Sequence, residues 1–144
     1  MNHRVAVMHG VNLDTLGRRD PAIYGTLTLT ELEGKVRRFA EEFGFSASFF
    51  QTNHEGEFCE ELHRTAERSD AVVLNPGAWT HYSYAIRDAL EVAALPAVEV
   101  HISDIESREE WRRHSVIRDL CVGHVQGRGM DGYRDAIEML RAAL

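Results

Sequence analysis

The stretch Val5-Ala6-Val7-Met8 decides the fold of this chain, because it is an apolar, strand-like run that leads through a loop into a helix. The loop extends from Gly17 to Gly25, and a helical pattern begins near Thr28. In α/β proteins ligands bind at the carboxyl ends of the strands, which is where this loop is expected to lie. It carries two arginines and Tyr24, so a potential base lies beside two fixed cations. We therefore expect the loop to take part in chemistry.

The same alternation of strand and helix continues to the end of the chain. Apolar residues at helical spacing follow the strand-like runs, as in segments 57–69 and 83–94. This pattern predicts βαβ units that build one parallel sheet in an α/β fold. No repeat or linker interrupts it, so residues 1–144 are expected to form a single domain. The five predicted strands are residues 5–8, 47–50, 71–74, 97–100 and 121–125.

Composition argues against several classes of partner. The 144 residues carry a net charge of −7, whereas nucleic-acid phosphates require a basic surface. No apolar run approaches the roughly 18 residues that a membrane helix needs, and no signal-peptide pattern opens the chain. Cys59 and Cys121 are isolated thiols without metal spacing, which favours a reducing, cytoplasmic location. We expect no nucleic-acid partner and no membrane association.

Residue counts and spacings also argue against imine chemistry, a metal site and a dinucleotide site. Lys35 is the single lysine beside fifteen arginines and lies inside a predicted helix, so imine chemistry is not expected. The eight histidines show no His-x-x-x-His spacing, which argues against a metal site. The letters from Gly127 to Gly132 match a dinucleotide pattern, but only twelve residues follow, too few for the rest of that unit. This segment is interpreted as a turn.

Polar residues follow three of the predicted strands. Asn12, Asn75 and His101 stand at the ends of the first, third and fourth strands, which converge on one crevice in a doubly wound sheet. Alternation along the fourth strand places Glu99 on the same face as His101, where its carboxylate can orient or charge the imidazole. A lone histidine is usually a satisfied core residue. The convergence of the three strand ends favours a functional site here.

Two arginines follow the crevice on a helix-like segment, residues 107–113. Arg108 and Arg112 are four residues apart, so on a helix they share a face and can aim at a ligand hydroxyl or carboxylate. The same charged run also fits a solvated helix face. Both interpretations stay open from the sequence.

Taken together, these segments resemble the type II 3-dehydroquinate dehydratases. The resemblance covers nearly the whole chain, and its motifs occur in order and at the family's spacing. They are Gly-x-Asn-Leu-x-x-Leu-Gly at 10–17, Tyr24-Gly25, Asn-His-Glu-Gly at 53–56, Asn-Pro-Gly-Ala at 75–78, Thr80-His81, Ile-Arg-Asp-Ala at 86–89, Glu-Val-His-Ile-Ser at 99–103 and Arg-Glu-Glu-Trp-Arg-Arg-His-Ser at 108–115.

The resemblance implies a flavodoxin-like three-layer sandwich with a five-stranded parallel sheet. It implies a lyase that dehydrates 3-dehydroquinate to 3-dehydroshikimate by anti elimination through an enolate, without metal, imine or cofactor. That reaction belongs to the shikimate pathway of aromatic amino acid biosynthesis. The family also implies a homo-oligomer, a dodecamer of four trimers.

The resemblance also assigns catalytic roles. Tyr24 is the base, and because a free phenol titrates near 10, it needs a cation such as Arg19 to become tyrosinate at neutral pH. Asn12 holds the enolate through an ordered water, in the manner of an oxyanion site. His101 protonates the departing hydroxyl as general acid, and Glu99 orients it and raises its pKa.

Six further residues are implied to bind substrate. The side chains of Asn75, His81 and Arg112 hold the ring hydroxyls. The backbone of Ile102 and Ser103 takes the carboxylate, and Asp88 reaches the site of a neighbouring subunit.

Five positions near the site differ from the residues usual in the family, and they leave alternatives open. One alternative is a diverged paralogue that acts on a related cyclic polyol acid, such as in quinate catabolism. Another is a non-catalytic ligand-binding or scaffold domain, although such a domain is expected to lose Arg19, Tyr24 or His101, and all three are present. The differing positions are His9, Val11, Tyr82, Asp104 and Glu106. Of these, His9 is expected to bring a titratable group near the enolate site.

Overall fold

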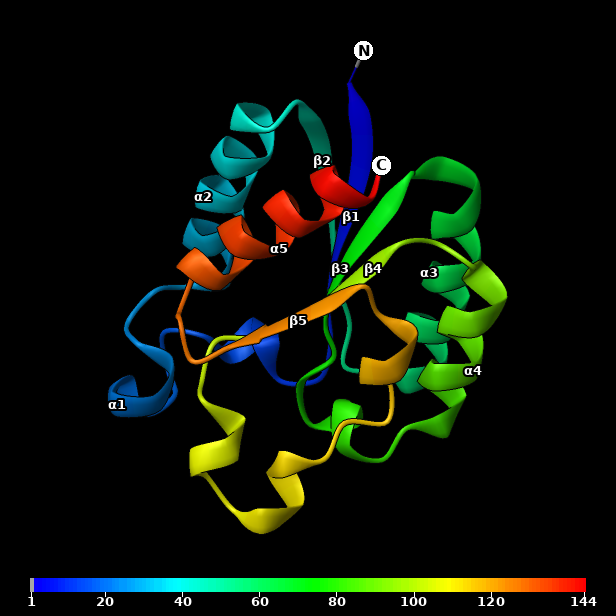
Figure 1. Ribbon diagram of the computed structural model, residues 1–144. Coiled ribbons are helices and arrows are strands. Elements are labelled where there is room, and N and C mark those ends of the chain that lie inside the picture. Colours follow the sequence, from blue (N-terminus) through cyan, green and yellow to red (C-terminus); the bar gives the residue numbers. More distant parts are fainter. Residues whose placement is uncertain (1) are drawn as a thin grey trace.

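The computed structural model describes residues 2–144 and contains a five-stranded sheet in which every strand pairing is parallel (Figure 1). Met1, which the predicted domain includes, lies outside the described residues. The strand order is β2-β1-β3-β4-β5. This confirms the predicted α/β fold. The strands are β1 (His3–His9), β2 (Phe45–Gln51), β3 (Ala71–Asn75), β4 (Ala97–His101) and β5 (Gly123–Gln126).

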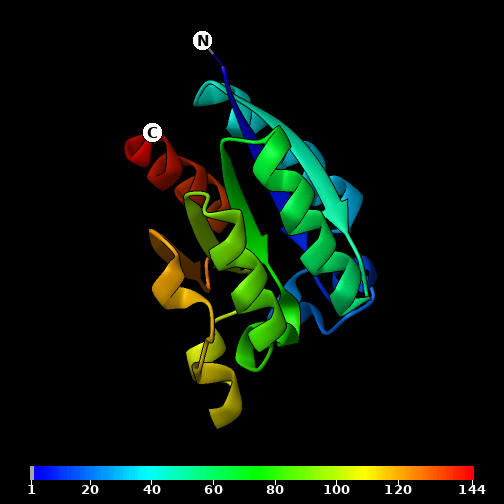
Figure 2. The ribbon, with the colours of Figure 1, turned by 90° about the vertical axis from the view of Figure 1, so that its right-hand side faces the viewer.

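Helices cover both faces of the sheet. Figure 1 shows α2 and α5 on one side, and Figure 2 shows α3 and α4 running side by side on the other. A short fifth helix, α1 (Pro21–Tyr24), is a single turn inside the 17–25 loop. The predicted three-layer sandwich is therefore confirmed. The four longer helices are α2 (Leu29–Glu42), α3 (Glu55–Arg68), α4 (Tyr84–Ala93) and α5 (Asp131–Ala143).

Apolar spacing and capping explain how α2 forms. The Thr28 side chain accepts a hydrogen bond from the backbone of Glu31, and the Glu31 carboxylate accepts one from the backbone of Thr28. Leu32, Val36 and Ala40 then fall on one stripe and are fully buried against the sheet. On the opposite face, a second apolar cluster joins α3 and α4 to the strands. The sheet is thus held from both sides, which keeps its strand ends fixed.

The point where the strand order reverses is the junction of β1 and β3. The turns that follow these strands touch backbone to backbone: a Cβ atom on Gly10 would lie 2.2 Å from the Pro76 carbonyl oxygen, and one on Gly77 would lie 2.6 Å from that of Val11. Only glycine permits this approach. The contact leaves a crevice outside the strand ends, the usual ligand position in doubly wound sheets.

The structure differs from the predicted elements in two places. β5 begins at Gly123 rather than Cys121, because residues 118–120 form a 3₁₀ turn that is closed by a bond from the Cys121 N–H to the Arg118 carbonyl. The predicted 107–113 helix is instead two 3₁₀ turns, Ile105–Ser107 and Glu110–Arg113, separated by the extended residue Arg108.

The segment from Gly127 to Gly132 joins β5 to the start of α5, as predicted for a turn, with Gly127 and Gly129 at positive φ. Within residues 2–144, no helix has the length and apolar character required to cross a membrane.

Candidate active site

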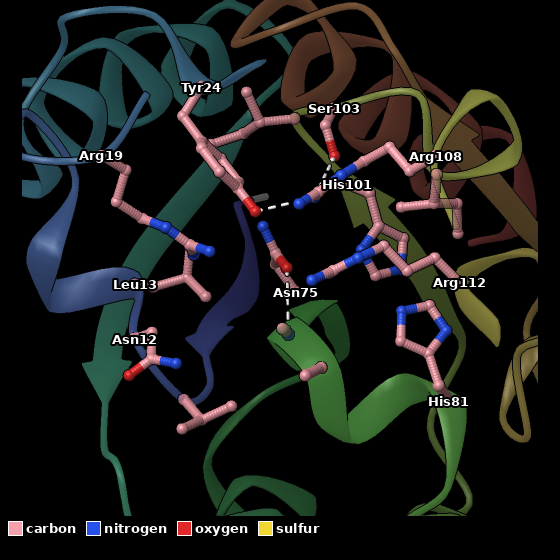
Figure 3. Close-up of a pocket in the computed structure, with 15 residues that line it drawn as sticks. Asn12, Leu13, Arg19, Tyr24, Asn75, His81, His101, Ser103, Arg108 and Arg112 are labelled. Carbon is pink, nitrogen blue, oxygen red and sulfur yellow. Dashed lines mark hydrogen bonds between the residues drawn. The ribbon is translucent and has the colours of Figure 1, made fainter. Parts of the chain in front are cut away.

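A pocket lies at the carboxyl ends of β1, β3 and β4, beneath the 17–25 loop (Figure 3). It encloses about 560 Å³, part of which is open to solvent. Nine of the eleven predicted site residues line it, namely Asn12, Arg19, Tyr24, Asn75, His81, His101, Ile102, Ser103 and Arg112. Glu99 lies behind His101, and Asp88 lies elsewhere, on the exposed side of α4.

The 17–25 loop is built to present Tyr24. Gly17 and Gly25 both adopt positive φ (93° and 73°), which lets the chain turn at each end. Between them, the Asp20 carboxylate accepts a hydrogen bond of 3.0 Å from the Ala22 N–H and so caps α1. Tyr24 is the last residue of this helical turn, and Figure 3 shows its hydroxyl pointing into the pocket.

Two arginines contact Tyr24 in different ways. Arg108 donates a hydrogen bond of 2.7 Å from Nη1 to the phenolic oxygen. Arg19 lies over the ring face, with its guanidinium carbon 3.9 Å from the ring centroid. Of the two, only Arg108 makes a direct hydrogen bond to the phenolic oxygen, whereas Arg19 contacts the ring.

Glu99 and His101 form a buried pair on β4, as their alternation along the strand predicted. His101 Nε2 lies 2.5 Å from Glu99 Oε2, and Glu99 also accepts hydrogen bonds from the hydroxyls of Thr80 and Ser115. Burial alone would raise the pKa of Glu99, but the bond from His101 and the two hydroxyl bonds lower it to about 2. Glu99 is therefore a carboxylate at neutral pH. Its bond to Nε2 leaves His101 Nδ1 as the ring nitrogen available to a ligand.

His81 stacks beside His101, with ring centroids 6.3 Å apart. Its Nδ1 is 2.7 Å from the carbonyl oxygen of His114, so Nδ1 carries a proton. Burial lowers the pKa of His81 despite this hydrogen bond. A neutral His81 then presents Nε2 as an acceptor. Arg112 completes this wall and is itself held by a 2.8 Å bond to Glu109.

The turn after β4 supplies backbone to the pocket. The carbonyl oxygens of Ile102 and Ser103 accept hydrogen bonds from the N–H groups of Gly129 and Gly127, at 3.2 and 3.0 Å. These bonds fix the turn against the β5–α5 connection. Among residues 2–144, no three His, Cys, Asp or Glu side chains gather as ligands for a metal ion.

Residues 3–141 match the family described as class II dehydroquinase. The chain belongs to this family. Among its relatives, the 3-dehydroquinate dehydratase of Bacillus pumilus is 51% identical over 93% of this chain and 91% of its own length. That of Syntrophotalea carbinolica is 53% identical over 90% of this chain and 88% of its own. The crystal structure of type II dehydroquinase from Propionibacterium acnes superimposes with a TM-score of 0.93 at 40% identity, covering 99% of this chain and 98% of that one.

The positions that differ from the usual dehydroquinase residues lie mostly outside the pocket. Of the five, only Val11 belongs to the lining residues described here. His9 is fully buried and does not line the pocket. Tyr82 is 58% exposed, Asp104 caps a 3₁₀ turn, and Glu106 lies 4.0 Å from Arg118. Four of the five positions therefore do not face the pocket.

Arg108 is the site residue that sequence reasoning did not select. Its spacing from Arg112 had suggested a shared helix face, but the two residues occupy different backbone states. Because Arg108 is extended, its side chain turns back to reach both Tyr24 and the Ser103 hydroxyl, at 2.7 and 3.4 Å. The position of this arginine as the first residue of the 108–115 motif was the available signal.

Burial of His9 predicts an acid-sensitive stability. Burial lowers the pKa of His9 to about 4, so below pH 6.5 the unfolded chain takes up a proton that the folded protein does not. Stability that is present above pH 6.5 is therefore lost as pH falls toward 4. We expect the free energy of unfolding to drop by about 2 kcal/mol more between pH 7 and pH 5 in the native protein than in His9→Gln.

Urea unfolding at both pH values, at one protein concentration, measures this difference. His81 titrates in both proteins, so its contribution cancels. Equal pH dependence in the two proteins would contradict a neutral, buried His9.

Proposed function

We propose that this chain dehydrates 3-dehydroquinate to 3-dehydroshikimate by anti elimination through an enolate, as a step of the shikimate pathway toward aromatic amino acids. The observation that carries the proposal is the presence, in one pocket, of Tyr24 bonded to Arg108 and of His101 bonded to Glu99. These groups match a reaction that removes a proton next to a ketone and then expels a hydroxyl. Residues 1–144 act as one flavodoxin-like catalytic domain.

Tyr24 acts as the base in the first step. Arg108 and Arg19 stabilise its tyrosinate form, which takes a proton from the carbon next to the ketone. The electron pair of the broken C–H bond moves into the ketone and gives an enolate. Asn12 holds the enolate oxygen through an ordered water. Asn12 is suited to this because it lines the pocket and its backbone, at φ 69°, is held by a hydrogen bond from its N–H to the Asn53 side chain.

His101 acts as the acid in the second step. The enolate collapses, the carbon–oxygen bond to the hydroxyl breaks, and the leaving oxygen takes the proton of His101 and departs as water. A carbon–carbon double bond conjugated with the ketone remains. Glu99, a buried carboxylate, stabilises the imidazolium before this transfer and holds the ring in place.

The remaining pocket residues bind the substrate. Asn75, His81 and Arg112 hold the ring hydroxyls, and the backbone of Ile102 and Ser103 takes the carboxylate. His81 accepts from a hydroxyl through Nε2, because its Nδ1 is committed to the His114 carbonyl.

The assembly we propose is a dodecamer of four trimers, in which Asp88 reaches the pocket of a neighbouring subunit. Two observations support a partner on this side: Asp88 lies exposed on α4, and large apolar side chains there are also exposed, Tyr84 at 68% and Val92 at 66%. We place the enzyme in the cytoplasm, in keeping with the free thiols of Cys59 and Cys121.

A steady-state assay with 3-dehydroquinate tests the proposal by following the ultraviolet absorbance of the conjugated enone. We expect turnover without added metal or cofactor. Borohydride added with substrate should leave activity intact, because Lys35 lies in α2 and is not among the pocket-lining residues. Negligible turnover of 3-dehydroquinate, or inactivation that requires both borohydride and substrate, would overturn the proposed reaction.

A further inference from the structure

Three buried polar side chains form a chain of hydrogen bonds directly behind the pocket. Asn75 ends β3, His9 ends β1, and Tyr133 lies in the first turns of α5; their exposed fractions are 4%, 0% and 0%. Asn75 Nδ2 lies 3.2 Å from Tyr133 Oη, which in turn lies 2.8 Å from His9 Nε2. Of the three, Asn75 alone lines the pocket. His9 and Tyr133 therefore touch the site only through it.

The orientation of the Asn75 amide determines which group donates in each hydrogen bond that links Asn75, Tyr133 and His9. The Asn75 Oδ1 atom accepts a 3.2 Å bond from the backbone N–H of Gly77, as Figure 3 shows. If the Asn75 amide were flipped, its NH₂ group would face the Gly77 N–H, and two donors cannot form a hydrogen bond. The NH₂ group of Asn75 must therefore face Tyr133, and because it can only donate, Tyr133 Oη accepts.

The tyrosine proton then goes to His9. Tyr133 Oη has no other hydrogen-bond partner among residues 2–144, so its own hydrogen is donated to His9 Nε2. This requires His9 to be neutral with its proton on Nδ1, an atom without a partner among the described residues. With the proton on Nε2 instead, two groups would lack a hydrogen-bond partner, the tyrosine hydrogen and the Nδ1 lone pair. With the proton on Nδ1, only that N–H lacks a partner, so this tautomer is favoured.

We propose that Tyr133 and His9 are positioning residues for catalysis: they form a directional relay that points the second N–H of Asn75 at a hydroxyl oxygen of the substrate. One amide hydrogen is held by Tyr133, which leaves the other free to face the pocket. The substrate oxygen at this position must therefore accept a hydrogen bond from Asn75. This inference rests on the proposed function for its substrate.

The neighbouring His81 presents a hydrogen-bond acceptor to the pocket, which complements the donor of Asn75. Its Nε2 accepts, whereas Asn75 donates, so a hydroxyl that lies between them can use both its lone pair and its hydrogen. A ligand without that hydroxyl leaves a buried donor and a buried acceptor unpaired. Such a mismatch discriminates strongly between substrates.

A double-mutant cycle tests whether Tyr133 acts through Asn75. Tyr133→Phe removes only the hydroxyl, and we expect KM for 3-dehydroquinate to rise about fivefold to tenfold while kcat changes less than about twofold. In an Asn75→Ala background, the same change should alter KM less than about twofold. An equal rise in both backgrounds would show that Tyr133 acts on the fold instead and would overturn the relay.

Two substitutions of His9 provide matched controls. The oxygen of Gln occupies nearly the position of Nε2 and can accept from Tyr133, so His9→Gln should keep a near-native KM. His9→Leu has no acceptor and should raise KM to the level of Tyr133→Phe. Equal KM values for the two His9 variants would contradict a role for the acceptor.

The tautomer of His9 is measurable without any substrate. Long-range ¹⁵N–¹H correlation spectra at pH 7 should show the His9 signals, identified by their loss in His9→Gln, with the proton on Nδ1 and Nε2 unprotonated. A proton on Nε2 would overturn the proposed direction. If His9 has the expected tautomer but 3-dehydroquinate is not turned over, the proposed function fails while the geometry of the relay stands.

Discussion

Replacing Tyr24 with phenylalanine is expected to lower kcat for 3-dehydroquinate by about a thousandfold or more. The substitution removes the oxygen that takes the substrate proton, and general-base catalysis contributes about 10²–10⁴ to such reactions. The ring stays beneath Arg19, so the 17–25 loop keeps its packing. KM should change little, because the phenol acts mainly in the transition state. The absorbance of the conjugated enone measures the loss.

Tyr82→Phe is the matched control for this substitution. It removes the same hydroxyl from a tyrosine that is 58% exposed and outside the pocket, and should leave kcat unchanged. Arg108→Met tests the cation separately: the phenol remains, but its 2.7 Å donor is lost, so kcat should fall although the base is still present. Turnover of Tyr24→Phe within about tenfold of the native rate would rule out Tyr24 as the base.

Replacing His101 with alanine is expected to lower kcat by about 10²–10⁴, through loss of the acid in the second step. Glu99→Gln should give part of this loss, because it removes the charge that stabilises the imidazolium. In the His101→Ala background, Glu99→Gln should have little further effect, since Glu99 acts through His101. Steady-state kinetics of the single and double variants measure these effects.

Hydrogen exchange separates the roles of the two residues. In D₂O, proton removal by Tyr24 replaces the hydrogen next to the ketone with deuterium, even when the hydroxyl cannot leave. We expect this exchange, followed by NMR of the substrate, to persist in His101→Ala and to disappear in Tyr24→Phe. Loss of exchange in both variants would place His101 in the first step and contradict its role as the acid of the second.

Local patterns predicted much of the fold and part of the site. Strand alternation alone put Glu99 beside His101, and the structure has them 2.5 Å apart because residues two positions apart on a strand share a face. The helical pattern predicted to begin near Thr28 likewise located the start of α2. These features depend on residues within one element, so the sequence contains the information directly.

Long-range contacts were not predictable in this way. Arg108 and Tyr24 are 84 positions apart, and their contact depends on a break between two 3₁₀ turns that helical spacing does not indicate. His9 and Tyr133 are 124 positions apart and meet because α5 packs across the sheet onto the end of β1. Such pairs follow from the packing of whole elements rather than from spacing along the chain.

In the proposed mechanism, Tyr24 and His101 finish each catalytic cycle in exchanged protonation states, because one has gained a proton and the other has lost one. The mechanism therefore predicts two proton isomers of the free enzyme, of which only one can begin a forward turnover. No hydrogen bond joins the two side chains among the described residues, and they belong to different elements, the 17–25 loop and β4. In that mechanism the proton returns through solvent, which reaches both side chains because part of the pocket is open to it.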